Sequence, residues 1–227
     1  MGIVEFVNGQ LIVNSHIITY GNAANELITE RIRAEIETMW NEPQGTVEWE
    51  GRMTRLSFKI TASCQPAITD VEIYANTDPR NNYFRIEEFV HGNISFVDAL
   101  GSNTGYFKLD NLYEGSTTAA HEYGHTLGLR HPEDLDIRGK GIPGIMYPRG
   151  TLVDPGFQYT PSAMAGDGRN GGTLNPVHRR VRPEELSLLK IHTLDFLNNT
   201  AVLGEFTSMW HPDHRDISAN EYLRPGT

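Results

Sequence analysis

The 227-residue sequence contains a single cysteine, Cys64. An intramolecular disulfide is therefore excluded, which suits a reducing compartment without ruling out an extracellular one. Long apolar runs are also missing, and none approaches the roughly 20 residues that a helix needs to cross a bilayer. The first residues, 1–13, lack the basic start and the cleavage site of a signal peptide. We therefore expect no membrane span.

Basic residues are scarce as well. The 19 lysines and arginines are outnumbered by 29 aspartates and glutamates, which gives a formal net charge of −10. This balance argues against binding nucleic acid or an anionic membrane through bulk electrostatics. The hydrophobic content of 38 % is ordinary for a globular protein, and the length is sufficient for a sizeable core.

The most informative segment is HEYGHTLGLRH, which runs from His121 to His131. On a helix, His121 and His125 lie one turn apart and project from the same face, which is the geometry for gripping one zinc ion. Gly128 falls where this helix should stop, since glycine adopts the left-handed conformation without steric cost. The chain can then turn and bring His131 back as a third ligand. Glu122 is left facing the remaining coordination position.

This set of side chains has the chemistry of a hydrolytic zinc site. Three neutral imidazoles hold zinc at about 2.0–2.1 Å and leave a fourth position for water. The cation lowers the pKa of that water to about 7 and polarises a carbonyl oxygen. Glu122 can accept the proton of the water and later donate it to a leaving amine. The sequence therefore predicts a hydrolase with one catalytic zinc ion.

A second motif follows the third histidine. Gly-Ile-Met-Tyr-Pro, at residues 144–148, would alone be an ordinary turn with a buried methionine. Behind HExxHxxGxxH it matches the Met-turn that lies beneath the metal site of metzincins. The chain thus resembles the metzincin metallopeptidases, and Gly-His-Thr-Leu-Gly-Leu at 124–129 is most similar to the matrixins. By this resemblance, Met146 forms a hydrophobic floor under the imidazoles.

The resemblance implies an α+β fold of the metzincin catalytic type. Its twisted mixed β-sheet would carry an active-site helix, a backing helix and a C-terminal helix. We expect one catalytic domain over residues 1–198, with an N-terminal subdomain over about 1–128 and a C-terminal subdomain over about 129–198. A C-terminal tail would occupy residues 199–227.

The same resemblance assigns roles around the Met-turn. Tyr147, Pro148 and Arg149 would line one wall of the pocket for the residue after the scissile bond. Arg149 would then influence which side chains are accepted, unless it simply points to solvent. An acidic pair at Glu184 and Glu185 would brace the Met-turn from the last helix.

Departures from the matrixin pattern limit the expected metal ions. Pro132 stands where matrixins usually have serine, and His91 stands alone in the region where they use several histidines for a second, structural zinc. No second zinc is therefore predicted. The scattered carboxylates fit no recognised calcium loop, so calcium is left open but unsupported, including at the glycine-rich loop 166–172.

Local patterns predict further elements. Alternation predicts two strands within residues 3–19, and an apolar stripe predicts a helix that is capped by Asn22 and reaches Trp40. Further strand signals lie at 46–50, 53–61, 70–75, 93–99 and 104–109.

The two later helices have start and stop signals of their own. Ser116 or Thr117 should cap the histidine-bearing helix, which should end at Leu127. Pro183 should start the last helix, because proline is favoured in a first helical turn.

We interpret the chain as a zinc-dependent metalloendopeptidase that hydrolyses internal peptide bonds of proteins. Its substrate would pair in extended form with an exposed sheet edge at residues 94–98. Two alternatives stay open: a metzincin-like zinc-binding interaction module, and a zinc hydrolase of a non-protein amide. The intact Glu122 counts against the first, because a binding module has no chemical need for that carboxylate.

The expected partners are protein or peptide substrates, without nucleic acid, and we expect a monomer. An inhibitor or immunity protein is left open as a further partner. Action outside the producing cell is favoured, because an uninhibited endopeptidase would damage the proteins of that cell. A cytoplasmic location is not excluded. The tail is expected to be flexible or packed on the surface. The alternative is that His211 or His214 approaches the zinc as a regulator.

Overall fold

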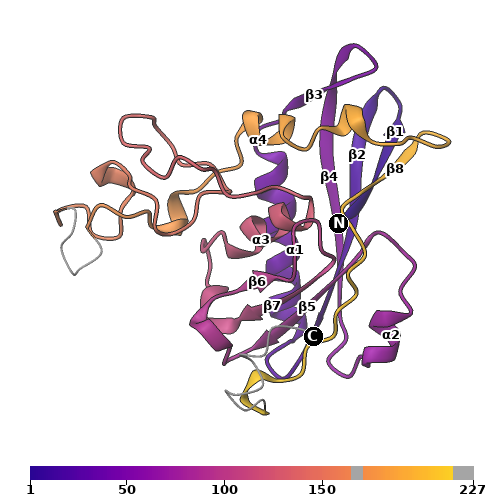
Figure 1. The fold of residues 1–227 in the computed structure, drawn as a ribbon, viewed down its shortest axis with the longest axis horizontal. Coiled ribbons are helices and arrows are strands. Elements are labelled where there is room, and N and C mark those ends of the chain that lie inside the picture. Colours follow the sequence, from indigo (N-terminus) through magenta and orange to yellow (C-terminus); the bar gives the residue numbers. More distant parts are fainter. Residues whose placement is uncertain (165–170, 217–227) are drawn as a thin grey trace.

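The computed structural model describes residues 1–164 and 171–216. These residues form a curled, open mixed sheet of eight strands together with four α-helices (Figure 1). The expected α+β class is therefore confirmed. None of the helices in the described ranges has the length and apolar character of a membrane span.

The strands are β1 (Gly2–Val7), β2 (Gln10–Tyr20), β3 (Thr46–Trp49), β4 (Arg52–Cys64), β5 (Asn81–Glu87), β6 (Phe96–Val97), β7 (Thr104–Lys108) and β8 (Thr200–Leu203). They are ordered β3-β4-β2-β5-β7-β6, with β1 on β2 and β8 on β1. The central pairs β2–β4, β2–β5 and β5–β7 are parallel, whereas the outer pairs are antiparallel. The short strand β6 therefore forms one edge of the sheet, and it lies against the histidine-bearing helix.

The helices are α1 (Glu26–Asn41), α2 (Asp70–Tyr74), α3 (Thr118–Thr126) and α4 (Pro183–Ser187). The backing helix α1 begins later than the sequence predicts. Asn25, not Asn22, caps it, because the Asn25 side chain accepts the backbone amide of Ile28 at 3.0 Å. The amide of Asn22 instead donates to Glu87 at 2.9 Å.

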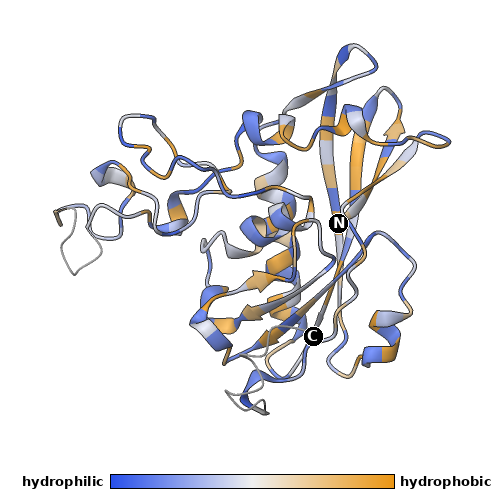
Figure 2. Cartoon of the chain, in the orientation of Figure 1, coloured by the Kyte–Doolittle hydropathy of each residue, from blue (hydrophilic) through white to orange (hydrophobic). Residues whose placement is uncertain are grey.

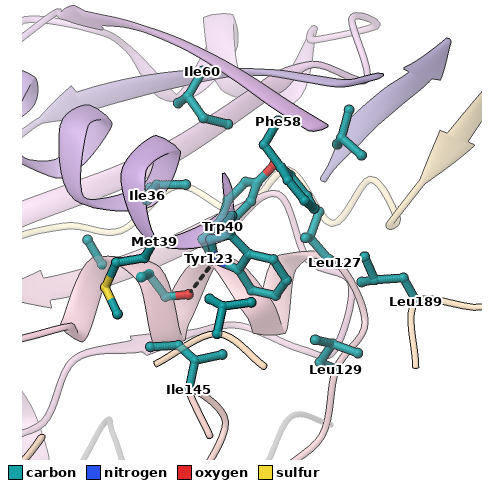
Figure 3. Close-up of a cluster of buried hydrophobic side chains, with 14 of the residues drawn as sticks. Ile36, Met39, Trp40, Phe58, Ile60, Tyr123, Leu127, Leu129, Ile145 and Leu189 are labelled. Carbon is teal, nitrogen blue, oxygen red and sulfur yellow. Dashed lines mark hydrogen bonds between the residues drawn. The ribbon is translucent and has the colours of Figure 1, made fainter. Parts of the chain in front are cut away.

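One hydrophobic core fastens α1 and α3 to the sheet. Trp40 of α1 packs against both Phe58 of β4 and Tyr123 of α3, and all three rings are buried (Figure 3). The Trp40 indole also donates a hydrogen bond to the backbone oxygen of Ala120 at 3.0 Å. The helix that carries the first two histidines is thus held against α1 by both packing and a buried hydrogen bond.

The prediction of a strand at 70–75 is wrong, because this segment is the helix α2. A capping box starts it: Thr69 accepts the amide of Glu72, while the Glu72 carboxylate accepts the amide of Thr69. Ile73 is the one position of this helix that is buried. Local capping chemistry therefore outweighs the alternating pattern that suggested a strand.

Strand β5 was missed because polar residues occupy buried positions in it. Arg85 and Glu87 are both buried and form an ion pair, with Arg85 Nε 2.8 Å from Glu87 Oε1. Asn82, which is also buried, donates to the backbone oxygen of Met1 at 2.8 Å. Such a strand has no apolar-polar alternation to reveal it.

Between α3 and α4 the chain leaves the sheet and forms a long excursion with little regular structure (Figure 1). Figure 2 shows hydrophobic residues concentrated in several strands of the sheet. A small cluster of Ile137, Val153 and Leu174 gives the excursion a core of its own. Most of the glycine-rich loop 166–172 that was considered for calcium, namely residues 166–170, lies outside the described residues. The last helix starts at Pro183 as predicted, but it is only five residues long.

The C-terminal segment returns to the sheet. Strand β8 pairs with β1, and the chain then follows the sheet as far as residue 216. His211 contacts Asp98 at 2.8 Å, and the ring of His214 stacks on Tyr106 of β7 with centroids 3.8 Å apart. The described part of the tail is therefore packed on the sheet. Neither imidazole belongs to the group of three histidines described next, so the structure does not place either of them as a metal ligand.

Candidate metal centre

Helix α3 carries the first two histidines, and groups outside the helix stabilise its N-terminus. Thr117 precedes it in a left-handed conformation, with φ at 59° and no side-chain cap. Its hydroxyl donates to Pro176 O at 2.8 Å, and Ser116 Oγ accepts the Thr118 amide at 3.3 Å. Glu35 of α1 accepts the amide of Ala120 at 3.1 Å, which places a carboxylate at the helix N-terminus.

The end of α3 matches the sequence prediction. The last helical residue is Thr126, and Leu127 forms the C-cap. Gly128 follows with φ at 91°, a left-handed conformation that favours glycine. This turn redirects the chain so that His131 comes back towards the helix.

The three histidines converge through their Nε2 atoms. His131 Nε2 lies 3.1 Å from His121 Nε2 and 3.0 Å from His125 Nε2. Tetrahedral zinc with bonds of 2.0–2.1 Å would place its ligand nitrogens about 3.3 Å apart. The spacing therefore fits a single metal ion, and these three residues are the group in the described ranges that can hold one.

Neighbouring carbonyls set the orientation of the rings. His121 Nδ1 donates to Ile145 O at 2.7 Å, and His125 Nδ1 donates to Leu129 O at 2.7 Å. Each neutral ring then presents an unprotonated Nε2 to the centre. Two such lone pairs face His131 Nε2, which can donate at most one hydrogen. A cation would satisfy all three nitrogens at once.

Burial keeps the imidazoles neutral. It lowers the pKa of His121 well below its usual value and the pKa of His125 to about 4, and it also lowers the pKa of His131. The positive charge of Arg179 acts in the same direction on all three. At neutral pH the rings are therefore in the form that binds metal.

Glu122 is buried beside the triad. Burial raises the pKa of its carboxyl to about 8, while the nearby charges of Arg179 and Arg149 oppose that rise. The carboxyl borders a cavity of about 210 Å³ that also includes His121 and His131 in its lining. A carboxylate with an affinity for protons near neutrality can act as a general base in this cavity.

The Met-turn lies behind α3. Met146 is buried and packs so closely on Gly124 that a methyl group there would overlap its sulfur and lie 3.1 Å from Trp40. Glu185 of α4 accepts the amides of Ile145 at 3.0 Å and Met146 at 2.9 Å. The expected acidic brace is therefore present at this second glutamate.

The residues predicted for the pocket wall separate into two groups. Pro148 and Arg149 line the cavity that holds Glu122. Tyr147 instead borders a different cavity, of about 660 Å³, and packs against the small core of the excursion. Ile94, just before edge strand β6, also lines the Glu122 cavity and is 60 % exposed.

Sequence reasoning missed three residues of this region. Arg179 lines the Glu122 cavity, Glu35 holds the start of α3, and Gly124 admits the methionine. The only available signal for Arg179 was a pair of arginines at 179–180 in an otherwise acidic chain. These arginines come near the triad only because the long excursion returns towards it.

No protein-family model matches this sequence, and no curated protein matches it either.

Proposed function

We propose that the protein is a zinc-dependent metalloendopeptidase with a metzincin-like centre. The observation that carries this proposal is that His131 Nε2 lies within 3.1 Å of both His121 Nε2 and His125 Nε2, beside a buried glutamate. A set of three imidazoles without thiolates suits zinc, and three protein ligands leave a position open for reaction. The motif and the Met-turn add the resemblance to metzincins.

Each group has a defined task in the proposed reaction. A metal ion held by the triad would polarise the scissile carbonyl and lower the pKa of the attacking water. The Nδ1 hydrogen bonds to Ile145 and Leu129 hold two imidazoles in place. Glu122 accepts the proton of the water and passes it to the leaving amine. The edge strand β6, beside α3, offers backbone groups to an extended substrate.

Replacing the base tests the proposal. Glu122→Ala and Glu122→Gln should each reduce cleavage of a peptide mixture roughly 10²–10⁴-fold, the usual contribution of general acid–base catalysis. Zinc content should stay at one ion per chain, because Glu122 is not a ligand. Glu114→Ala, which removes an exposed glutamate, serves as the control and should cleave like the wild type.

Two outcomes would count against an endopeptidase. Equal cleavage by the wild type and Glu122→Ala would exclude the assigned base. Zinc binding without cleavage of any peptide would favour the interaction module, or a hydrolase of non-protein amides.

A further inference from the structure

Two guanidinium groups line the cavity that holds Glu122. Arg149 comes from the segment directly after the Met-turn, and Arg179 comes from the end of the excursion. Arg149 is exposed and donates to Asn111 Oδ1 at 3.3 Å. Arg179 is only 4 % exposed. A positive pair beside the triad contrasts with the net charge of −10 of the whole chain.

The guanidinium of Arg179 has one nitrogen that is unsatisfied within the part of the chain that the structure describes. Its Nε atom is buried and has no hydrogen-bond partner among the described residues. Among the same residues, Arg179 and the neighbouring Glu122 are not in direct ion-pair contact. Glu35, another negative group near Arg179, already accepts the amide of Ala120. An unsatisfied buried cation is costly, so its retention in a cavity wall points to an anionic ligand.

The protonation of Arg179 is compatible with that role. Burial lowers the pKa of Arg179 to about 10, and Glu122 opposes the change. The side chain therefore remains a cation at neutral pH. Tyr113 and Tyr159 are near enough to influence both this charge and each other, so polar groups surround the site.

We propose that Arg179, assisted by Arg149, binds a carboxylate of the substrate next to the scissile bond. The preferred substrates would therefore carry an aspartate or glutamate beside the bond that is cut. This inference rests on the proposed peptidase function. A guanidinium can donate two parallel hydrogen bonds to a carboxylate, and charge-assisted bonds of this kind are strong.

The size and charge of the cavity agree with this ligand. Its volume of about 210 Å³ equals that of roughly seven waters, which is room for one acidic side chain with some solvent. Glu122 faces the same space and would repel a carboxylate. Two arginines outnumber that single glutamate, so the formal balance of the lining still favours an anion.

Matched peptides test the proposal by a ratio of rates. Two internally cleaved peptides should differ only by Glu or Gln beside the scissile bond, first on one side and then on the other. The wild type should prefer Glu by roughly tenfold or more in kcat/KM, as expected for a charge-assisted pair. Arg179→Gln should reduce this preference to within about twofold, and the ratio cancels any general effect on Glu122. Arg180→Gln is the matched control, because this adjacent exposed arginine does not line the cavity.

Further experiments distinguish a side-chain carboxylate from a C-terminal carboxylate, and a wrong inference from a variant that does not fold. A peptide with Gln and a free C-terminal carboxylate at the same place, cleaved as well as the Glu peptide, would assign the site to chain ends. Arg149→Gln provides an exposed variant if Arg179→Gln does not fold, and it should weaken the preference for Glu. Equal rates for Glu and Gln in the wild type would overturn the inference.

A binding measurement keeps the inference separate from turnover. Zinc-loaded Glu122→Ala should bind the Glu peptide more tightly than the Gln peptide by fluorescence anisotropy, and adding Arg179→Gln should remove the difference. If no peptide is cleaved but this difference persists, the peptidase proposal fails while carboxylate recognition stands. If peptides are cleaved but the difference is missing, only the carboxylate site fails.

Discussion

At the scale of single residues, the centre depends on side chains that come from outside the histidine motif. Glu35 reaches from α1 to the amide of Ala120, and Glu185 reaches from α4 to the amides of the Met-turn. Glu185 is buried and Glu35 is half-buried, and the loss of solvation raises the pKa of each carboxyl group. Carboxylates of this kind hold the backbone in place but make stability depend on pH.

The pH dependence of Glu35 has a definite sign. Because its pKa is raised in the folded protein, the folded state binds its proton more tightly than the unfolded state does. The contribution to the free energy of unfolding is therefore fully present below the ordinary value of 4.5 and is lost as pH rises through the raised pKa. Glu35→Gln should remove this pH-dependent loss of unfolding free energy. The unfolding free energy of the wild type minus that of the variant should therefore fall as pH rises.

Urea unfolding at a series of pH values checks this prediction. Glu42→Gln, an exposed change at the end of the same helix, should show no comparable trend. A constant difference between the wild type and Glu35→Gln from pH 4 upwards would show that Glu35 does not titrate with the assigned shift.

At the scale of elements, the C-terminal segment is fastened to β5 by a buried cation. Arg85 pairs with Glu87 and also donates to the backbone oxygen of His211 at 2.7 Å. Its guanidinium lies 5.6 Å from the ring of Tyr20 and 5.8 Å from that of Trp210. One side chain thus joins β2, β5 and the returning tail.

Removing this cation should destabilise the protein strongly. Arg85→Met leaves the buried Glu87 without its closest cation and should cost roughly 3–5 kcal/mol of unfolding free energy. Arg80→Met breaks an exposed pair with Asp78 and should cost at most about 1 kcal/mol. Denaturant unfolding of both variants measures the contrast, and similar losses would mean that the Arg85 pair is not the fastening point.

The elements also show what the sequence can and cannot predict. Helix α3 was predictable to its end because its signals are local: a histidine pair one turn apart and a glycine where the helix stops. Strand β5 was hidden because its buried Arg85 and Glu87 are satisfied by each other and by groups distant in the sequence, namely the amide of Asn22 and the tail. The pattern at residues 70–75 predicts a strand, but the capping box of Thr69 and Glu72 starts helix α2 there.

The same contrast holds for the candidate site. The three ligands and Glu122 are close in sequence, so their spacing defines the chemistry. Arg179 reaches the cavity only through the fold of the excursion, and no local pattern reports that contact. The residue proposed for substrate recognition is therefore less visible in the sequence than the residues proposed for catalysis.

At the scale of the whole molecule, the candidate metal centre lies where the excursion leaves helix α3. Helix α3 supplies two ligands, and the chain beyond Gly128 supplies the third before it continues to the Met-turn. Bound metal would therefore link α3 to the excursion. Binding to the folded state alone would also stabilise the protein, by about 2.7 kcal/mol at a free concentration of 100 times Kd.

The most direct test is a zinc titration of metal-stripped protein, with cleavage of a peptide mixture followed by mass spectrometry. The rate of internal cleavage should rise in proportion to added zinc and level off at one ion per chain. His131→Ala, which removes the third ligand, should abolish this rise. Cleavage that is independent of zinc, or unchanged in His131→Ala, would contradict a metallopeptidase built on this centre.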